Sequence, residues 1–520
     1  MSLVVWLGSG AAITAVTIFA LKLWSDYQKF KSLRSFPSPK GYWLLGNGPQ
    51  LIKAAKENTF NSLKADWAKK LGPIYVYWVG NNPTLILSNP KIIKKTIVQA
   101  FKHKTLIRNP KQGETWEEIL GAPVMIQQEG ESWQWRRQTH NKNFHSAYLK
   151  DYSQIVSQAC EQIIDICKTK ASKQETIEVD PLFSELTMRI ICRLVLGITL
   201  DDKNNSIEGP PLEPKKLKEA LSILTNQFIT KVIEKGKWMQ YLPNFSQRKF
   251  NDARQYLQDF IEPRVDFALK IAREGKQADI LGVSPLFETS ILVQLAKQFK
   301  FTKEMLCAET ISLIFAGTDP TAHTLSFTVG AIGLNPGVFQ KARDEVDRFF
   351  QLNVNITFDN LKELSYIKAI VREGMRLYPV TNGGSGYIVE TDTVIEGVNV
   401  PKGTEIGWSI MAAGRDVEEY PHPNEFLPER WMKKTRKNKN DSLPAFLFFG
   451  SGPHRCLGES LAFLEAITML AMLICYFEWE VINGRNSLFH LGQNLNMFPR
   501  DLMPIKFTLR ILTEQTVVVN

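Results

Sequence analysis

The spacing of hydrophobic residues predicts that most of the chain is helical. Two long apolar segments, residues 304–330 and 459–475, have the length of buried helices, and the second holds only two charges. Residues 213–275 have the pattern of two amphipathic helices joined by an apolar loop near residues 238–243. Such a loop would either rest in a membrane interface or form a simple packed turn.

Strand signals are confined to a few short segments. Residues 74–79 and 84–87 are rich in β-branched and aromatic side chains and flank a Gly-Asn-Asn-Pro cluster, which predicts a hairpin. Residues 393–404 predict a strand, a turn and a second strand, and residues 488–510 have hairpin character with a turn near residues 496–498. Together these patterns predict a mainly α fold with a small β region.

The amino-terminal residues form an apolar run that could cross a bilayer. Residues 3–23 contain no charge before Lys22, and as a helix they would span about 30 Å. The run resembles neither a secretory signal nor a mitochondrial transit peptide. Positive charges follow it, so the positive-inside rule leaves the bulk of the chain in the cytosol. We therefore predict a single-pass membrane anchor at 1–24, a basic, proline-containing hinge at 25–41 and a single domain at 42–520. A buried core helix is the alternative for the first segment.

Composition and charge narrow the class of protein. The chain is 44% hydrophobic and 22% charged, which is ample for a large core. Its 63 Lys and Arg exceed its 53 Asp and Glu, but we find no basic stripe interleaved with aromatic residues and no nucleic-acid-binding motif. An anionic membrane surface or an acidic protein partner fits this charge better than nucleic acid. The six cysteines form no disulfide framework, so reduced thiols are expected.

One cysteine lies in a setting typical of a metal ligand. The stretch 449–458 reads F-G-x-G-x-H-x-C-x-G and leads directly into the second apolar segment, so a glycine-rich loop would deliver Cys456 to the start of a buried helix. The positive end of that helix favours the thiolate, which is the form that binds metal. The glycines let a flat group come close. Because no second Cys or His stands at zinc spacing, the position suits an axial ligand of haem iron. A small buried hydrophobic residue is the alternative.

The full pattern closely resembles the haem-binding signature of the cytochrome P-450 superfamily, in its membrane-anchored eukaryotic microsomal type. Cys456 matches the thiolate ligand, Phe449 and Gly450 begin the loop, and His454 stands where the family more often has Arg. The resemblance extends over nearly the whole chain. It implies the haem-thiolate fold of that superfamily and the cofactor haem b, iron protoporphyrin IX.

A second motif resembles the family's contact with a haem propionate. Trp133 and Arg137 lie at i, i+4 in a segment of helical character, so both project from one face and could grip a carboxylate. A solvated Arg beside a core Trp is the alternative. Family members usually carry an Arg for the other propionate, but only Tyr387 lies near that place. A hydroxyl or a water would then hold that propionate.

The predicted central helix carries the motif A-G-T-D-P-T, which resembles the oxygen-activation motif of the family, usually A-G-x-D/E-T. The resemblance implies that Ala316 and Gly317 contact the haem and that Asp319 relays protons. Thr321 or Thr318 would be its hydroxyl partner.

Pro320 occupies the place of the usual Thr in this motif. Proline cannot donate the hydrogen bond to the carbonyl of Ala316, so the helix is expected to open there. A bound dioxygen or water would need such a gap. The alternative is a kinked core helix with a capped aspartate.

Three further charges resemble the family's structural brace of the cysteine loop. Glu373 and Arg376 lie at i, i+3 on one helix face, where they can pair, and Arg430 lies in a P-E-R-W segment. An isolated pair of this kind is normally a weak surface contact. The resemblance implies a buried Glu–Arg–Arg cluster in which losing one member would strand a buried charge.

The resemblance implies a haem-thiolate monooxygenase that inserts one oxygen atom of O2 into a lipophilic substrate, by hydroxylation or epoxidation. Electrons would come from NADPH through a separate membrane-bound flavoprotein reductase, because the chain carries no flavin or nucleotide motif. The basic run at 433–439 would either steer an acidic electron donor or be solvated. Residues such as Val380, Thr381 and Phe498 suggest an apolar cavity.

Together with the predicted anchor, the resemblance to the microsomal type implies a place in the endoplasmic reticulum membrane, with the catalytic domain on the cytosolic side. Two other functions stay open. A reductase-independent isomerase or dehydratase would act on peroxides, and this function stays open because Pro320 replaces the usual Thr. A non-catalytic haem-binding sensor is the second.

Overall fold

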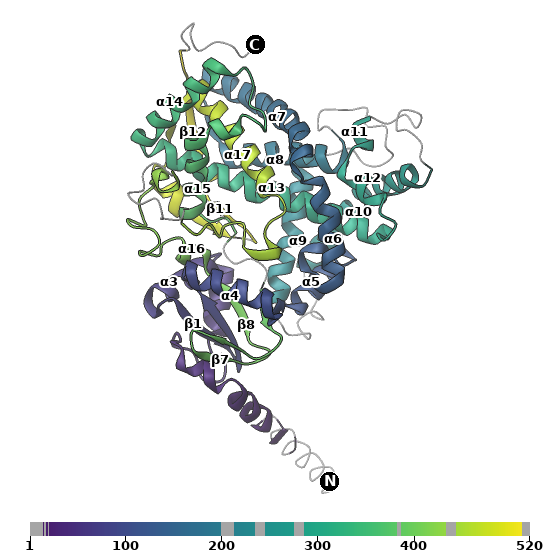
Figure 1. The fold of residues 1–520 in the computed structure, drawn as a ribbon, viewed down its shortest axis with the longest axis vertical. Coiled ribbons are helices and arrows are strands. Elements are labelled where there is room, and N and C mark those ends of the chain that lie inside the picture. The colour runs from purple at the N-terminus through teal and green to yellow at the C-terminus, as the bar shows by residue number, and fades with distance from the viewer. Residues whose placement is uncertain are drawn as a thin grey trace. The chain divides into compact units, whose positions relative to one another are not determined.

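The computed structural model describes residues 14, 17, 18, 20–198, 213–234, 245–274, 285–381, 386–432, 444–493 and 495–511. The chain is mainly helical with small β-sheets, as predicted, and it divides into two compact units (Figure 1). Unit 1 contains residues 1–109, 383–416 and 451–453, and unit 2 contains residues 110–382, 417–450 and 454–520.

Unit 1 is built on a five-stranded sheet with the strand order β1-β2-β8-β5-β3. The predicted hairpin is confirmed: β1 and β2 are antiparallel, with Ile74 opposite Leu87. The predicted strand–turn–strand is also confirmed, because β6 and β7 pair around Glu396 and Gly397, both at positive φ as a tight two-residue turn requires. The strands are β1 (Ile74–Val79), β2 (Asn82–Leu87), β3 (Leu106–Arg108), β5 (Tyr387–Val389), β6 (Thr393–Ile395), β7 (Val398–Val400) and β8 (Glu405–Trp408), and the helices are η1 (Lys31–Ser35), α2 (Gly48–Lys56), α3 (Phe60–Leu71), α4 (Pro90–His103) and α16 (Ile410–Ala413).

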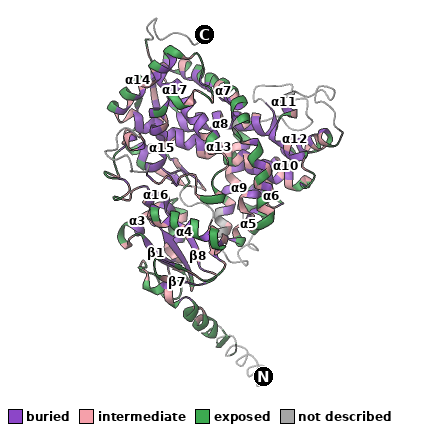
Figure 2. Ribbon diagram, viewed as in Figure 1, coloured by how far each residue is buried: buried purple, intermediate pink, exposed green. Residues whose placement is uncertain are grey.

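The segment predicted as a hinge, residues 25–41, packs onto this sheet. Phe30 and Leu33 are buried, and the N–H of Val76 in β1 donates to the carbonyl of Pro37 over 2.9 Å. Of the predicted anchor at 1–24, only residues 14, 17, 18 and 20–24 are described; those are helical and mostly exposed (Figure 2), and the others lie outside the described residues.

Unit 2 is a helical body with two small sheets. Its helices are α5 (Pro110–Leu120), η2 (Met125–Gln127), α6 (Gly130–Asn143), α7 (Ser146–Ser172), α8 (Val179–Leu196), α9 (Pro214–Glu234), α10 (Phe245–Glu274), α11 (Pro285–Glu288), α12 (Ile291–Ala296), α13 (Lys303–Gly333), α14 (Pro336–Leu352), η5 (Leu361–Glu363), α15 (Ser365–Leu377), η6 (Pro428–Trp431), α17 (Glu459–Tyr476) and α18 (Asn486–Phe489). Its strands are β4 (Thr176–Glu178), β9 (Phe477–Val481), β10 (Leu491–Gln493), β11 (Met497–Pro499) and β12 (Pro504–Leu509), arranged as β4-β12-β9 and β10-β11.

Helix α13 runs through the core of unit 2, where α8, α15 and α17 pack around it (Figure 1). Its start is fixed by Thr302, whose side-chain oxygen accepts a hydrogen bond from the N–H of Met305. The close packing of α8 depends on Gly317, because a Cβ at this position would lie 2.6 Å from Ile191 of α8. Together, the cap and this contact fix the position of the A-G-T-D-P-T segment.

Three further sequence predictions meet the structure in unit 2. The amphipathic helices at 213–275 are confirmed as α9 and α10, whereas the joining loop at 238–243 and the basic run at 433–439 lie outside the described residues. The hairpin predicted within 488–510 is confirmed as β10 and β11, but of its predicted turn only Asn496 lies between the strands, because Met497 and Phe498 belong to β11. All six cysteines are free thiols, as expected.

Among the described residues, one helix is long and apolar enough to cross a bilayer. That helix is α17, and most of it is buried inside unit 2 (Figure 2). Its apolar character is accounted for by burial in the core.

Candidate functional site

The loop before α17 presents Cys456 at the start of that helix, as the sequence predicts. The N–H of Cys456 donates to the carbonyl of Phe449 over 2.8 Å, which closes the loop on itself. Gly450 and Gly452 have φ angles of +75° and +71°, so both need the left-handed backbone that glycine adopts without strain. A Cβ at Gly450 would meet nothing closer than 4.0 Å, which leaves this side of the loop open to a flat group.

The ionisation of Cys456 differs from the expectation. The surrounding chain desolvates the thiol and raises its pKa, although Cys456 itself is exposed, and Glu459 adds to this rise. The N–H of Gly458 at the helix N-terminus lowers the pKa, as do Arg137 and Arg455, but the pKa stays above its usual value. The helix terminus therefore acts in the predicted direction, but alone it does not bring the pKa of the thiol below its ordinary value. A coordinating metal ion would deprotonate such a thiol.

Trp133 of helix α6 lies beside the same loop. The rings of Trp133 and His454 meet edge to face, with centroids 4.5 Å apart. The indole Nε1–H of Trp133 is buried and has no hydrogen-bond partner within the described residues. His454 Nε2 lies 3.6 Å from Glu129 Oε2. A buried donor without an acceptor costs about 1–3 kcal/mol, so this position suits an added acceptor.

Arg137 follows Trp133 by one turn of α6. Its side chain is partly buried, and no ion pair or hydrogen bond joins it to the described part of the chain. Burial lowers the pKa of Arg137, and the nearby Cys456 sulfur opposes this shift. A guanidinium group and an unpartnered indole N–H on one helix face fit a carboxylate, as a haem propionate would supply. The residues present therefore fit the implied cofactor.

Helix α13 carries the second predicted constellation. Ala316 is exposed although it lies in the middle of a core helix, so it borders open space. Thr318 donates its hydroxyl to the carbonyl of Ile314 over 2.7 Å, which commits it to the backbone. The side chains of Asp319 and Thr321 have no hydrogen-bond partners in the part of the chain that the structure describes. Of the two candidate hydroxyls, that of Thr321 is the one left available.

The helix continues through Pro320. Helical structure extends from Lys303 to Gly333, with Pro320 inside it. The missing N–H removes one hydrogen bond to Ala316, but the helix does not break at this point. The predicted opening is therefore limited to the loss of this donor.

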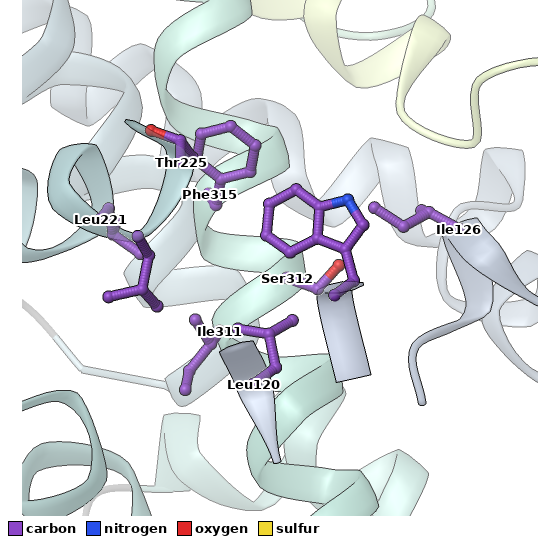
Figure 3. A pocket seen from close by; sticks show the side chains of 9 residues that line it. Leu120, Ile126, Leu221, Thr225, Ile311, Ser312 and Phe315 are labelled. Carbon is purple, nitrogen blue, oxygen red and sulfur yellow. The ribbon is translucent and has the colours of Figure 1, made fainter. Parts of the chain in front are cut away.

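An apolar pocket lies against the same helix (Figure 3). Its lining includes Trp116 of α5, Ile126 of η2, Leu221 of α9, and Ser312 and Phe315 of α13, whose side chains converge from four elements. Ser312, Ala316 and Asp319 follow at i, i+4 and i+7, so the pocket shares a helix face with the predicted relay. Val380, Thr381 and Phe498, which suggested a cavity, do not line this pocket.

The three predicted bracing charges meet in unit 2. Glu373 is fully buried and accepts from Arg376 Nη2 at 2.7 Å and Nε at 2.9 Å, and from Arg430 Nε at 2.9 Å. The indole N–H of Trp431 and the backbone N–H of Leu427 donate to the same carboxylate, each at 2.9 Å. The two guanidinium groups also donate to four backbone carbonyls in residues 421–425. The cluster thus fixes the segment before the cysteine loop.

Two contacts near the site could not be predicted from the sequence. In unit 1, buried Arg108 lies directly opposite Tyr387 in the β3–β5 pair, so a guanidinium group does occupy the neighbourhood where no Arg was found. In unit 2, Glu309 of α13 pairs with Arg136 of α6 at 2.7 Å and accepts from the N–H of Met125 at 2.8 Å, which fixes η2 beside the pocket. Neither contact has a local signal, because the partners are far apart in the sequence.

Comparison with known proteins agrees with this geometry. The family model described as Cytochrome P450 matches residues 36–507. Cytochrome P450 3A14 from Cavia porcellus is 25% identical over 512 residues, 96% of each chain. Cytochrome P450 3A13 from Mus musculus is 26% identical over 475 residues, 89% of this chain and 90% of the relative. The match spans both the Cys456 loop and the central helix, and the chain therefore belongs to the cytochrome P450 family, in its eukaryotic microsomal type.

Proposed function

We propose that this member of a haem-thiolate monooxygenase family hydroxylates or epoxidises a lipophilic substrate with electrons from a separate reductase. The observation that supports the proposal most is the unpartnered, buried N–H of Trp133, which lies beside Arg137 and His454 on the approach to Cys456. Such donors imply an anionic cofactor edge next to a cysteine ligand.

The residues that would hold haem b follow from this arrangement. Cys456 would supply the thiolate that holds the iron, Trp133, Arg137 and His454 would bind a propionate, and Phe449, Gly450, Ala316 and Gly317 would make the other contacts. When bound, the group supplies thiolate-ligated iron, which activates O2 for cleavage. Arg376, Arg430 and Glu373 have a structural role, because they brace the segment that leads to the ligand.

The protein's own side chains do the remaining work. The apolar lining of the pocket would form one wall of the substrate site, next to the face of α13 that carries Ala316. Asp319 holds a proton at its carboxylate and passes it toward the oxygen site, with the Thr321 hydroxyl as its partner. Thr321 takes this role because the hydroxyl of Thr318 is committed to Ile314.

The partners and the location are part of the same proposal. Because the chain has no flavin or nucleotide motif, NADPH-derived electrons come from a flavoprotein reductase. Residues 1–24 anchor the protein in the endoplasmic reticulum membrane, with the catalytic domain on the cytosolic side. The microsomal relatives support this location.

One experiment separates this function from its rivals. The purified protein is reconstituted with haem, reductase and a panel of fatty acids, sterols and terpenoids, and NADPH oxidation, O2 uptake and product are measured. The proposal predicts O2 uptake that depends on NADPH and on substrate. Turnover of a hydroperoxide without reductase, and no O2 uptake, would instead assign the isomerase or dehydratase function that Pro320 keeps open. Haem binding without any substrate-induced change in the iron spin state would assign a sensor.

A further inference from the structure

A buried charged cluster lies one helical turn beyond Asp319 in unit 2. His323 of α13 is 6% exposed, and its Nδ1 lies 2.8 Å from Oδ1 of Asp180 on α8, which is 2% exposed. Ser326 of α13 donates its hydroxyl to the same oxygen over 2.8 Å. A buried ion pair of this kind is expensive to desolvate, so its presence in the core calls for an explanation beyond stability.

The charges around His323 favour its protonated form. Burial lowers the pKa of His323, but the carboxylate and hydrogen bond of Asp180 raise it, Asp319 adds to the rise, and the pKa ends above its ordinary value. Lys218 of α9 opposes this rise. For Asp180, burial raises the pKa, but His323 outweighs it and the pKa is lowered. Each partner therefore favours the charged form of the other.

The geometry also fixes which ring nitrogen is free. Because Nδ1 is committed to Asp180, Nε2 is the nitrogen that can release a proton. Nε2 has no hydrogen-bond partner among the described residues, and neither has the carboxylate of Asp319. His323 follows Asp319 at i, i+4, so the two side chains share a face of α13. No ion pair within 4.0 Å joins the two side chains, so a proton would pass between them through water.

We propose that His323, held by Asp180, is the positioning residue that supplies protons to Asp319. The step is a simple proton transfer. The Nε2–H bond of the imidazolium breaks, the proton passes through a water to a carboxylate oxygen of Asp319, and neutral Nε2 then recovers a proton from solvent water. Asp180 stays ionised throughout and holds the ring by Nδ1–H. The inference rests on the proposed role of Asp319 in oxygen activation.

The outer side of the cluster is connected to α9. Lys218 is partly exposed, and its Nζ donates to the hydroxyl of Ser184 over 2.7 Å. That hydroxyl donates in turn to the backbone carbonyl of Asp180 over 2.9 Å. A carbonyl oxygen carries no proton onward, so Lys218 contributes charge to the cluster and is not itself part of the transfer path.

The test uses His323→Asn in the haem-loaded protein. The asparagine amide can keep the hydrogen bond to Asp180, so a merely structural role is rescued, but it cannot carry a proton. Dioxygen that is reduced but not cleaved leaves as hydrogen peroxide, so we measure the fraction of NADPH electrons recovered as peroxide between pH 6 and 9. In the wild type this fraction rises with pH as His323 deprotonates. In the variant we expect a fraction that no longer depends on pH and a coupled turnover about tenfold lower.

A second readout follows the histidine itself. The carbon-monoxide complex of the reduced protein, labelled with 13C-histidine, gives the titration of His323 by NMR, with the variant supplying the assignment. We expect a midpoint above the ordinary 6.5, and a midpoint below it in Asp180→Asn, because burial then dominates. The peroxide profile of Asp180→Asn must move to lower pH in step with this midpoint.

Three outcomes are decisive. His422→Asn is the matched control, since this exposed histidine also lies 3.5 Å from a carboxylate, and it must behave as the wild type. Wild-type coupling in His323→Asn, or an unshifted profile in Asp180→Asn, overturns the inference. The absorption band of the thiolate–carbon monoxide complex is recorded for every variant, because its absence in the wild type would instead overturn the proposed function.

Discussion

Replacing Glu373 by glutamine tests the buried ion cluster of unit 2 in isolation. The carboxylate accepts four side-chain hydrogen bonds from Arg376, Arg430 and Trp431, and both Glu373 and Arg376 are 0% exposed. Glutamine keeps the volume but removes the charge, and its amide offers one acceptor oxygen where the carboxylate offers two. Two guanidinium groups then lose their only carboxylate partner among the described residues.

Breaking a buried ion pair costs about 3–5 kcal/mol. This is a large part of the free energy of unfolding of a protein, which is roughly 5–15 kcal/mol. At about 2 °C per kcal/mol for a large domain, we expect the melting temperature to fall by roughly 6–10 °C. Urea and thermal unfolding of the haem-loaded protein, followed by haem absorbance and circular dichroism, measure the loss.

Asp359→Asn is the matched control. Asp359 pairs with Lys150 at 2.9 Å, but the two side chains are 69% and 56% exposed, so we expect a change below about 1 kcal/mol. If Glu373→Gln does not accumulate as folded protein, Trp431→Phe removes a single N–H donor and should cost about 1–3 kcal/mol. The reasoning is refuted if Glu373→Gln unfolds with the same free energy as the control.

Three further outcomes follow from the structure. Trp133→Phe removes the unpartnered indole N–H, and competition for haem with an apo-globin should show an affinity roughly 10- to 100-fold weaker, the value of a hydrogen bond to an anion. Gly317→Val forces a methyl into Ile191 and should lower the free energy of unfolding by about 1–3 kcal/mol, part of which Ile191→Ala restores in the double variant. The Asp180–His323 pair makes stability depend on pH. Because the pKa of Asp180 is lowered in the folded state, the pair stabilises the fold above about pH 3.9, and this stabilisation is lost as the pH falls through the folded pKa. Because the pKa of His323 is raised, its contribution is present below about pH 6.5 and is lost as the pH rises through the folded pKa. The urea midpoint should therefore decline on the alkaline side in the wild type and decline less in Asp180→Asn.

The fold could be predicted wherever one segment carries its own pattern. Helix α13, helix α17 and the β1–β2 hairpin each show a clear period over enough residues, and each appears at the predicted place. Strands β3 and β5 span three residues each and exist because they pair with each other across a long stretch of chain. Three residues are too few for a periodic pattern, and β3 and β5 lack the adjacent turn that identifies the equally short β6 and β7, so they could not be predicted.

The residues of the site also differ in whether a local sequence motif marks them. Cys456 and the pair Glu373–Arg376 lie in short motifs whose spacing implies their neighbours. The pair Asp180–His323 has no such motif, because its members come from α8 and α13 and meet only when these helices pack. The pKa of the Cys456 thiol could not be predicted for a related reason: the helix terminus is a local feature, whereas desolvation by the surrounding chain, the larger effect, depends on the fold.

The most direct test of the account replaces Cys456 by serine and records the difference spectrum of the reduced protein with carbon monoxide. Cys475→Ser is the control, because Cys475 is a free, buried thiol of α17 outside the proposed site. We predict that the wild type and the control show the band of a thiolate-ligated haem and turn over substrate with reductase, whereas Cys456→Ser loses both. A Cys456→Ser protein that keeps the wild-type band and turnover would contradict the assignment of this sulfur as the iron ligand.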